Sequence, residues 1–250
     1  MMTGIWGKSG VRLAMAAGLA LWLAGCASTP PTPEMIANND PWEPTNRDTL
    51  KLNGKIDKYF VIPTVGVYFF LVPQGGRRAV HNFLQNISLP TVFVNDVLQG
   101  EARRAGQTLA RFTINTTLGL GGLLDPATSK FHIPGHGEDF GQTLAVWGVD
   151  EGPYLVLPFF GPQPPRDALG QVVDVLLDPT THIHFKQHLW WDVGRYYFTL
   201  LDLRGQTYST VQGIQRGSVD YYASLRSLYR QLRNNEIRNG RPDTKDLPEF

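Results

Sequence analysis

Apolar side chains recur every three or four residues in several segments of the chain, which is the period of one face of a helix. The residues that share a face are Ala105, Leu109, Phe112 and Thr116 between Glu101 and Thr117, and Ala168, Val172, Val175 and Leu176 after Pro165. Pro164 and Pro165 stand where the start of a helix tolerates proline. The chain shows no regular series of alternating strands and no internal repeat. The pattern therefore predicts a mainly α protein with a single domain.

A second periodic stretch lies near the carboxyl end and predicts one long helix of about six turns. Its apolar seam consists of Val211, Ile214, Ser218, Tyr221, Leu225, Leu228 and Leu232. Gly240 and Pro242 are expected to end this helix. Packing within the same chain is the favoured use of the seam, and an intermolecular coiled coil is the alternative.

Two short segments are apolar on all sides, and prolines flank each of them. They are Thr64–Val72 and Tyr154–Phe160, and both are far shorter than the roughly 20 residues of a membrane-spanning helix. Each segment is either buried in protein or lies shallowly in lipid, and the residues alone favour burial. Aromatic rings at Trp190-Trp191 and Tyr196–Phe198 suit the headgroup level of a bilayer, although such clusters are also common in cores.

The amino terminus has the pattern of an export signal. Lys8 and Arg12 precede the apolar run Leu13–Leu23, which is too short to span a bilayer. The run ends in Leu23-Ala24-Gly25-Cys26, a lipobox, so we expect residues 1–25 to be removed and Cys26 to carry the lipid anchor. Ala27 stands where Asp would retain the protein at the inner membrane, which predicts sorting to the inner leaflet of the outer membrane.

Composition divides the rest of the chain and narrows its chemistry. Residues 26–39 are rich in Thr, Pro and Asn and predict a flexible lipidated tether. Residues 40–240 form the predicted helical domain, and 241–250 a tail. Cys26 is the only cysteine, so its lipidation excludes disulfides, cysteine metal sites and a thiol nucleophile. The net charge of +1 gives no electrostatic argument for binding nucleic acid.

Motifs of catalysis are missing from the sequence. It contains no G-x-S-x-G elbow, no H-E-x-x-H and no Walker motif in the mature chain. Gly119-Leu-Gly-Gly122 resembles a phosphate loop only superficially, because the dinucleotide fingerprint would need glycine where Leu124 stands. A helix terminator or hinge is the better interpretation of this segment. We expect a protein that is not an enzyme.

Histidines form two groups whose imidazoles are candidate metal ligands. His182, His184 and His188 lie close together, and His132 and His136 form a pair. No acidic or cysteine partner stands at a matching offset, so we expect exposed loop histidines and no metal. The pair Glu138-Asp139 has no spacing that separates catalysis from a solvated turn or a helix cap.

Several longer motifs, in order, resemble the MlaA (VacJ) family of outer-membrane lipoproteins. They are Asp40-Pro41-Trp42-Glu43-Pro44-x-Asn46-Arg47, Pro90-x4-Asn95-Asp96-x-Leu98-Gln99-Gly100, Arg111-Phe112-x2-Asn115-x2-Leu118-Gly119-x-Gly121-Gly122-x2-Asp125, Asp139-Phe140-Gly141-Gln142-Thr143-Leu144-x2-Trp147-Gly148, Gly152-Pro153-Tyr154 and Arg166-Asp167. The resemblance covers most of the chain after residue 39.

The resemblance implies a ring-like helical body, embedded in one membrane leaflet, with a central amphipathic channel. Family members take misplaced phospholipid from the outer leaflet and pass it to a soluble periplasmic carrier, MlaC, which preserves lipid asymmetry. They associate with trimeric porins, and an inner-membrane ATPase complex supplies the energy. No cofactor is implied beyond the lipid on Cys26. The apolar segments are then expected to touch acyl chains.

Polar residues within the matching motifs are the candidates for a channel wall that meets lipid headgroups. They are Asp96, Arg111, Asn115, Asp139, Gln142 and Arg166. Each could instead be a cap or a buried structural partner. Gly119, Gly121 and Gly122 are candidate hinges. Two other functions remain open: a scaffolding lipoprotein that binds porin or cell wall without moving lipid, and a lipid-modifying hydrolase.

Overall fold

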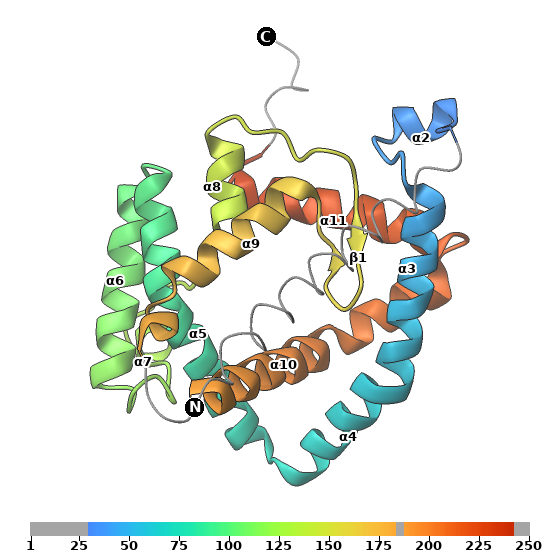
Figure 1. Cartoon of the computed structure of the whole chain (residues 1–250). Helices are drawn as coiled ribbons and strands as arrows, with labels where there is room; N and C mark the ends of the chain where they lie inside the picture. The colour runs from blue at the N-terminus through green and yellow to red at the C-terminus, as the bar shows by residue number, and fades with distance from the viewer. Residues whose placement is uncertain (1–29, 184–187, 243–250) are drawn as a thin grey trace, which may run out of the picture.

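The computed structural model describes residues 30–183 and 188–242, and most of these residues are helical (Figure 1). The elements are α2 (Pro33–Ala37), α3 (Glu43–Ile56), the π-helix η1 (Asp57–Val61), α4 (Ile62–Leu71), α5 (Gln74–Leu98), α6 (Ala102–Thr117), α7 (Pro126–Ser129), α8 (Phe140–Val146), β1 (Val156–Leu157), β2 (Gly161–Pro162), α9 (Pro165–Leu177), the 3-10 helix η2 (Pro179–His182), α10 (His188–Gly217) and α11 (Tyr221–Ile237). The prediction of a mainly α fold is confirmed.

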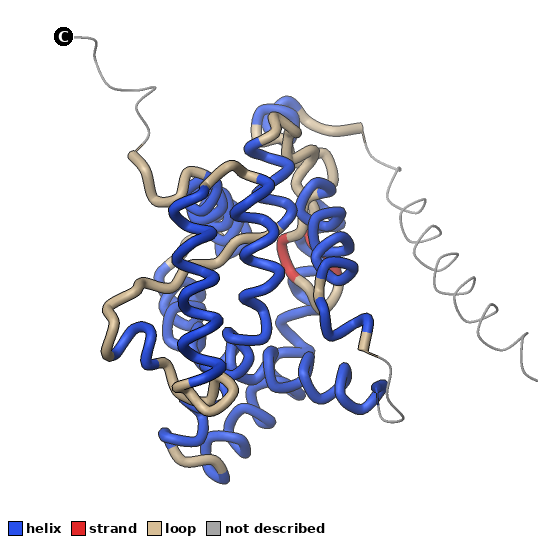
Figure 2. The backbone as a smooth tube through the Cα atoms, turned by 90° about the vertical axis from the view of Figure 1, so that its left-hand side faces the viewer, coloured by secondary structure: helices blue, strands red, loops and turns tan. Residues whose placement is uncertain are grey.

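The helices follow one another around a ring (Figure 1). α3, η1 and α4 run along one side and the bottom, and α5 turns back upward beside α6 on the other side. α8, α9 and α11 lie across the top, and α10 crosses the lower part, where it contacts both α4 and α5. Within the described ranges the only strands are β1 and β2, a two-residue antiparallel pair shown in red in Figure 2.

The helices predicted after Glu101 and Pro165 are confirmed as α6 and α9, but much of each apolar face lies on the surface. On α6, Leu109 is 51% exposed, whereas Thr108 and Arg111 are buried. On α9, Val172 is 59% exposed and Arg166 is buried. The periodicity identifies which side chains share a face, and the neighbouring helices cover the polar face instead of the apolar one.

The prediction of a single long helix near the carboxyl end is wrong, because two helices occupy this region. α10 ends at Gly217, and α11 begins at Tyr221. Asp220 caps α11, since its carboxylate accepts hydrogen bonds from the amides of Tyr222 and Ala223. The apolar seam therefore continues across the short connection between two helices.

Each short apolar segment is divided between core and surface. Val65 and Tyr68 of α4 pack with Leu201 of α10 in a small hydrophobic cluster, whereas Phe70 is 87% exposed. In the second segment Tyr154 and Val156 are fully buried beside Tyr222, while the turn that follows β1 exposes Phe159 and Phe160. The predicted burial is correct for only one part of each segment.

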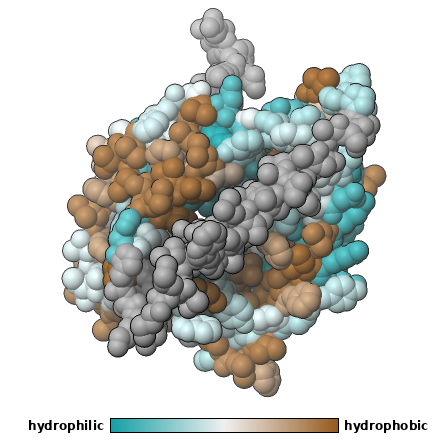
Figure 3. Space-filling model, viewed as in Figure 1, coloured by the Kyte–Doolittle hydropathy of each residue, from teal (hydrophilic) through white to brown (hydrophobic). Residues whose placement is uncertain are grey.

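Polar residues dominate the interior of the described chain. The buried polar and charged residues outnumber the buried hydrophobic ones, and many large hydrophobic side chains are exposed. Figure 3 shows hydrophobic residues gathered at the upper left, over α6, α8 and α9, and at the bottom, over α4. This distribution is the reverse of that in an ordinary globular core.

The sequence predicts that the folded body begins at Asp40, but the structure shows that it begins earlier. α2 lies within the expected tether, and its Met35 is buried. Cys26, the signal 1–25 and most of the tail 241–250 lie outside the described residues. No single described helix is both long and apolar enough to cross a membrane, but Glu43–Leu71 and Gln74–Leu98 meet the length and composition test as a pair bent by 117°.

Candidate functional site

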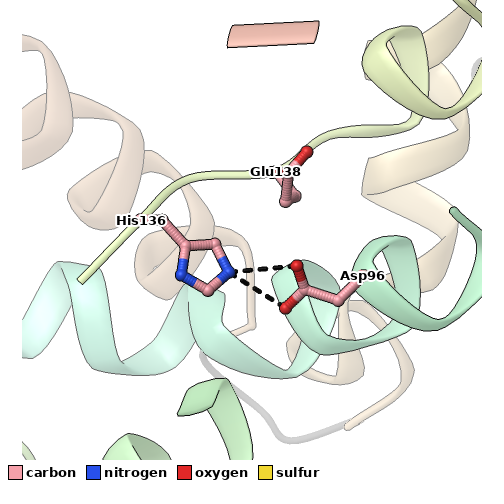
Figure 4. A group of neighbouring side chains, drawn as sticks. All are labelled: Asp96, His136 and Glu138. Carbon is pink, nitrogen blue, oxygen red and sulfur yellow. Dashed lines mark hydrogen bonds and ion pairs between the residues drawn. The ribbon is translucent and has the colours of Figure 1, made fainter. Parts of the chain in front are cut away.

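The first polar cluster surrounds Asp96, which is fully buried on α5. The hydroxyl of Thr108 on α6 donates to Asp96 Oδ2 at 2.6 Å. Nε2 of His136 lies 3.0 and 3.1 Å from the two carboxylate oxygens (Figure 4). Arg104 Nε lies 3.7 Å from Oδ1, and its Nη2 donates to Glu138 Oε1 at 2.5 Å. We call Asp96, Arg104, Thr108, His136 and Glu138 the Asp96 cluster.

The expectation of exposed loop histidines is wrong for His136, whose side chain is only 12% exposed. Its acidic partner Asp96 is 40 residues away in sequence, so no local spacing could indicate it. Of the alternatives open for the pair Glu138-Asp139, a solvated turn does not fit Glu138, because this residue is buried. Burial raises the pKa of the Glu138 carboxyl against the opposing effects of Gln99 and Arg104.

The second cluster joins α6 to α7 through Arg111. The guanidinium donates to Asp125 Oδ2 at 3.0 Å, to Thr128 Oγ1 at 2.6 Å and to the carbonyl of Ile133 at 2.6 Å. Asn115 donates to Asp125 Oδ1 at 2.9 Å. Burial raises the pKa of the Asp125 carboxyl, but hydrogen bonds from Thr128, Asn115 and Arg111 outweigh burial and lower it to about 2. We call these residues the Arg111 cluster.

A pocket of about 340 Å³ connects these two clusters. Its lining residues are His81, Asn82, Gln85, Asn86, Leu89, Arg111, Asn115, Asp125, Thr128, Gly135 and His136. The side-chain oxygen of Asn86 and Nε of Arg111 are buried without a hydrogen-bond partner. The residues of the pocket wall therefore include polar atoms that the protein does not pair.

The third cluster joins α8, α9 and α11 through Arg233. Asp139 caps α8 by accepting from Gln142 N at 2.9 Å, which confirms the helix-cap alternative for this residue. Arg233 donates to both carboxylate oxygens of Asp139 and to Asp167, which also accepts from Arg166 at 3.0 Å. Burial opposes ionisation of Asp139 and Asp167, but Arg233 lowers the pKa of both carboxyls. We call these five residues the Arg233 cluster.

A second pocket, of about 440 Å³, opens beside the Arg233 cluster. It is lined by Asp139, Gln163, Asp167, Gln171, Asp174, Tyr229, Leu232, Arg233 and Glu236. Asp174 accepts hydrogen bonds from Phe140 N at 3.0 Å and Asn95 Nδ2 at 2.9 Å. Burial raises the pKa of the Asp174 carboxyl. The wall of this pocket therefore carries more carboxyl groups than guanidinium groups, since Arg233 is its one arginine.

Sequence reasoning missed Asp40 and Asn46, although both lie in the first matching motif. Asn46 donates to Asp40 Oδ1 at 2.9 Å and accepts from Val156 N at 2.9 Å. Arg226 and Tyr222 of α11 both donate to Asp40 Oδ2 at 2.5 Å. These contacts attach α3 to β1 and α11. The sequence signal that could have identified Asp40 and Asn46 is their position as polar residues inside a long motif.

The glycine segment ends α6, as the terminator interpretation predicts. Gly121 and Gly122 have φ of +71° and +97°. The amide of Gly122 donates to the carbonyl of Asn115 at 2.9 Å. A Cβ at Gly122 would lie 2.5 Å from Asn86 Cβ, whereas a Cβ at Gly121 would meet nothing within 4 Å. Gly119 is equally confined, because a Cβ there would lie 2.3 Å from the carbonyl oxygen of Asn115.

The six headgroup candidates thus fall into three clusters, and each has a protein partner. Arg111 and Asn115 line one pocket, and Asp139 lines the other. Of the other histidines, His182 Nε2 lies 2.7 Å from the carbonyl oxygen of Leu176. His184 and the side chain of His188 lie outside the described residues, so the role of that group stays a prediction.

The comparison with known proteins agrees with this architecture. Residues 38–236 match the model of the MlaA lipoprotein family. The intermembrane phospholipid transport system lipoprotein MlaA of Escherichia coli is 34% identical over 91% of this chain and 88% of that protein. The protein of the same description from Haemophilus influenzae is 29% identical over 89% and 88%.

A solved structure, described as the structural basis for maintenance of bacterial outer membrane lipid asymmetry, contains a similar chain. The two superpose with a TM-score of 0.71 at 30% identity, over 79% of this chain and 98% of the other. The match in sequence and in fold, together with the ring of helices and its polar interior, places the chain in a known family. The protein belongs to the MlaA lipoprotein family.

Proposed function

We propose that this protein removes misplaced phospholipid from the outer leaflet of the outer membrane and passes it to a periplasmic carrier, as a lipoprotein anchored in the inner leaflet. The single observation that carries the proposal is the reversed polarity of the described chain, in which charged groups are buried and large apolar groups are exposed. The proposal agrees with the names of the Escherichia coli and Haemophilus influenzae relatives, which are lipoproteins of an intermembrane phospholipid transport system.

The exposed apolar surface suits contact with acyl chains. Phe70 at the end of α4 is 87% exposed, and Trp190 on α10 is 74% exposed. The apolar face of α9, which includes Leu176, is also uncovered. These side chains lie on helices, whose backbone groups are satisfied internally, so they can enter a leaflet without exposing unpaired amides to lipid.

The polar interior suits a headgroup that must pass through protein. Arg111 and Asn115 line the pocket of about 340 Å³, and Asp139 lines the pocket of about 440 Å³. We infer that these three residues contact headgroups during passage. Asp96, Gln142 and Arg166 then serve the same wall by holding its helices together through the contacts described above.

Lipidation of Cys26 would fix the body at the periplasmic face of the outer membrane, because a mature lipoprotein carries enough acyl chains for stable attachment. We propose a trimeric porin and the carrier MlaC as partners, and nucleic acid is not among the partners proposed. We propose no catalytic step for this chain: the mature sequence has no Walker motif, and the energy is assigned to an inner-membrane ATPase complex.

Deletion of the gene, followed by labelling of surface-exposed phospholipid on intact cells, tests this function. Loss of the protein should raise outer-leaflet phospholipid, and the wild-type gene should restore the low level. Unchanged lipid asymmetry with altered attachment of the membrane to the cell wall would contradict transport and favour the scaffolding function.

A further inference from the structure

We propose that Asp96, His136 and Glu138 form a binding site for one divalent first-row transition metal ion. The inference rests on the juxtaposition of three ligand groups, and it is independent of lipid transport. Asp96 comes from α5, while His136 and Glu138 come from the segment between α7 and α8 (Figure 4). One ligand atom from each residue lies within 4.8 Å of the other two.

The chemistry of these groups fits such an ion. One imidazole nitrogen and two carboxylate oxygens are a donor set that Zn²⁺, Mn²⁺ and Fe²⁺ accept. Ligand atoms about 2.1 Å from a tetrahedral metal are about 3.4 Å apart, so side-chain movements of about 1 Å bring all three into range. Asp96 and Glu138 are buried. Thr108 donates a hydrogen bond to Asp96 Oδ2, and Gln99 donates one to Glu138 Oε2, so both carboxylates are held in place.

The site also has a route to solvent and an open side. His136 both contacts Asp96 and lines the pocket of about 340 Å³. Three protein ligands leave at least one coordination position, and the pocket can supply a water molecule to fill it.

Arg104 is the competitor for this site. Its guanidinium contacts both carboxylates and compensates part of their charge. Two negative charges against one positive charge leave the cluster net negative when His136 is neutral. The Arg104 side chain is 22% exposed, so it can turn outward when a dication takes its place. A metal site therefore predicts that removal of Arg104 strengthens metal binding, and a simple ion-pair network does not predict this.

The consequence of binding would be structural. Between α7 and α8 the chain runs without helix, and it contributes Ile133 and Gly135 to the surroundings of Arg111. A metal that joins Asp96 of α5 to His136 and Glu138 would fasten this segment to the helices. It would stabilise the wall of the pocket that Arg111 and Asn115 line.

Metal titration of the mature, lipidated protein in detergent, purified without a polyhistidine tag, tests the inference. Wild-type protein stripped with chelator should bind one equivalent of Zn²⁺ in calorimetry, and Co²⁺ should give visible ligand-field absorption. His136→Asn should weaken Zn²⁺ binding by at least about tenfold. The matched control is His132→Asn, because His132 is exposed and has φ of +53°, a conformation that asparagine tolerates.

Arg104→Gln provides the second arm. Removal of the competing cation should raise Zn²⁺ affinity several-fold and increase the rise in Tm caused by Zn²⁺. Absence of stoichiometric Zn²⁺ and Co²⁺ binding to the wild-type protein would overturn the inference, whatever the variants do. Equal affinity of wild type and a folded His136→Asn variant, or lower affinity after Arg104→Gln with the fold retained, would overturn it as well.

Discussion

Arg233 on α11 donates two hydrogen bonds, at 2.6 and 2.7 Å, to the carboxylate of Asp139 at the start of α8, although the residues are 94 positions apart. The same guanidinium also donates to Asp167 of α9. One buried cation therefore ties three helices together at the top of the ring. This contact shows how the fold is held by polar groups where a soluble protein would use an apolar core.

Replacing Arg233 by Met should lower the free energy of unfolding by about 3 kcal/mol, because it removes the cation that pairs with Asp139 and leaves the buried Asp167 with Arg166 alone. Urea unfolding in detergent, followed by circular dichroism, measures the change. The control is Lys51→Met, which breaks an exposed ion pair with Asp48 and should cost less than about 1 kcal/mol. Equal stability of the two variants would contradict a structural role for Arg233.

Acid should weaken the Arg111 cluster through Asp125. The pKa of this carboxyl is about 2 in the folded protein, below the value of about 3.9 in an unfolded chain. The unfolded state therefore binds the proton first, so the contribution of Asp125 is present above about pH 4 and is lost as the pH falls toward 2.

Asp125→Asn should be less stable than wild type at pH 7, and the difference should narrow between pH 4 and pH 2. Thermal unfolding across this range provides the measurement. The variant keeps the capping oxygen for Thr128 N but removes the charge that faces Arg111. A stability difference that stays constant over the whole range would show that the charge of Asp125 does not matter.

The glycine segment predicts unequal effects at neighbouring positions. Gly122→Val should strain a backbone with φ of +97° and push against Asn86, a residue of the 340 Å³ pocket. Gly121→Val should strain the backbone alone, and Gly121→Asn should be tolerated. We expect surface phospholipid to change for Gly122→Val, and less for Gly121→Val, at normal protein abundance. Wild-type lipid and detergent resistance in both valine variants would remove any hinge function from this segment.

The exposed aromatic residues predict membrane contact beyond the lipid anchor. Phe70→Asp should reduce binding of the mature chain, produced without its acyl groups, to vesicles of phosphatidylethanolamine and phosphatidylglycerol. The fold should persist, because Phe70 is almost fully exposed. Flotation of vesicles measures the binding, and Phe70→Leu is the apolar control. If the Asp and Leu variants float equally well, α4 does not enter the bilayer.

The anchor is tested at its single attachment point. Cys26→Ala should abolish incorporation of labelled palmitate and leave a mislocalised precursor, because the chain has no other cysteine. Metabolic labelling followed by immunoprecipitation measures this directly. Palmitate on the alanine variant would show that Cys26 is not the lipidated residue.

The sequence predicts α6 and α9, because the glycine segment follows the end of α6 and prolines mark the start of α9. It does not predict which face each helix buries. Leu109 and Thr108 differ by one position on α6, and the spacing alone cannot say whether water, lipid or protein covers Leu109. The break before α11 is similarly hidden, since the apolar seam continues past Asp220, whose capping role only the backbone reveals.

The site was predictable only in part. The matching motifs identify Asp96, Arg111 and Asp139 as polar residues of the interior, and all three are in polar clusters. Their partners come from distant positions, such as Arg233, which lies in a polar stretch without a motif. No periodicity joins residues so far apart, so the clusters could only be recognised in the folded chain.

Re-expression of the protein tests the central claim most directly. In a strain that lacks the gene and has accumulated surface phospholipid, expression of the wild-type chain is induced, and outer-leaflet phospholipid is labelled on intact cells over time. Removal by this protein predicts that surface phospholipid falls after induction, and that it stays high when the Cys26→Ala variant is induced instead. Surface phospholipid that remains unchanged after the lipidated wild-type protein has reached the outer membrane would contradict the account.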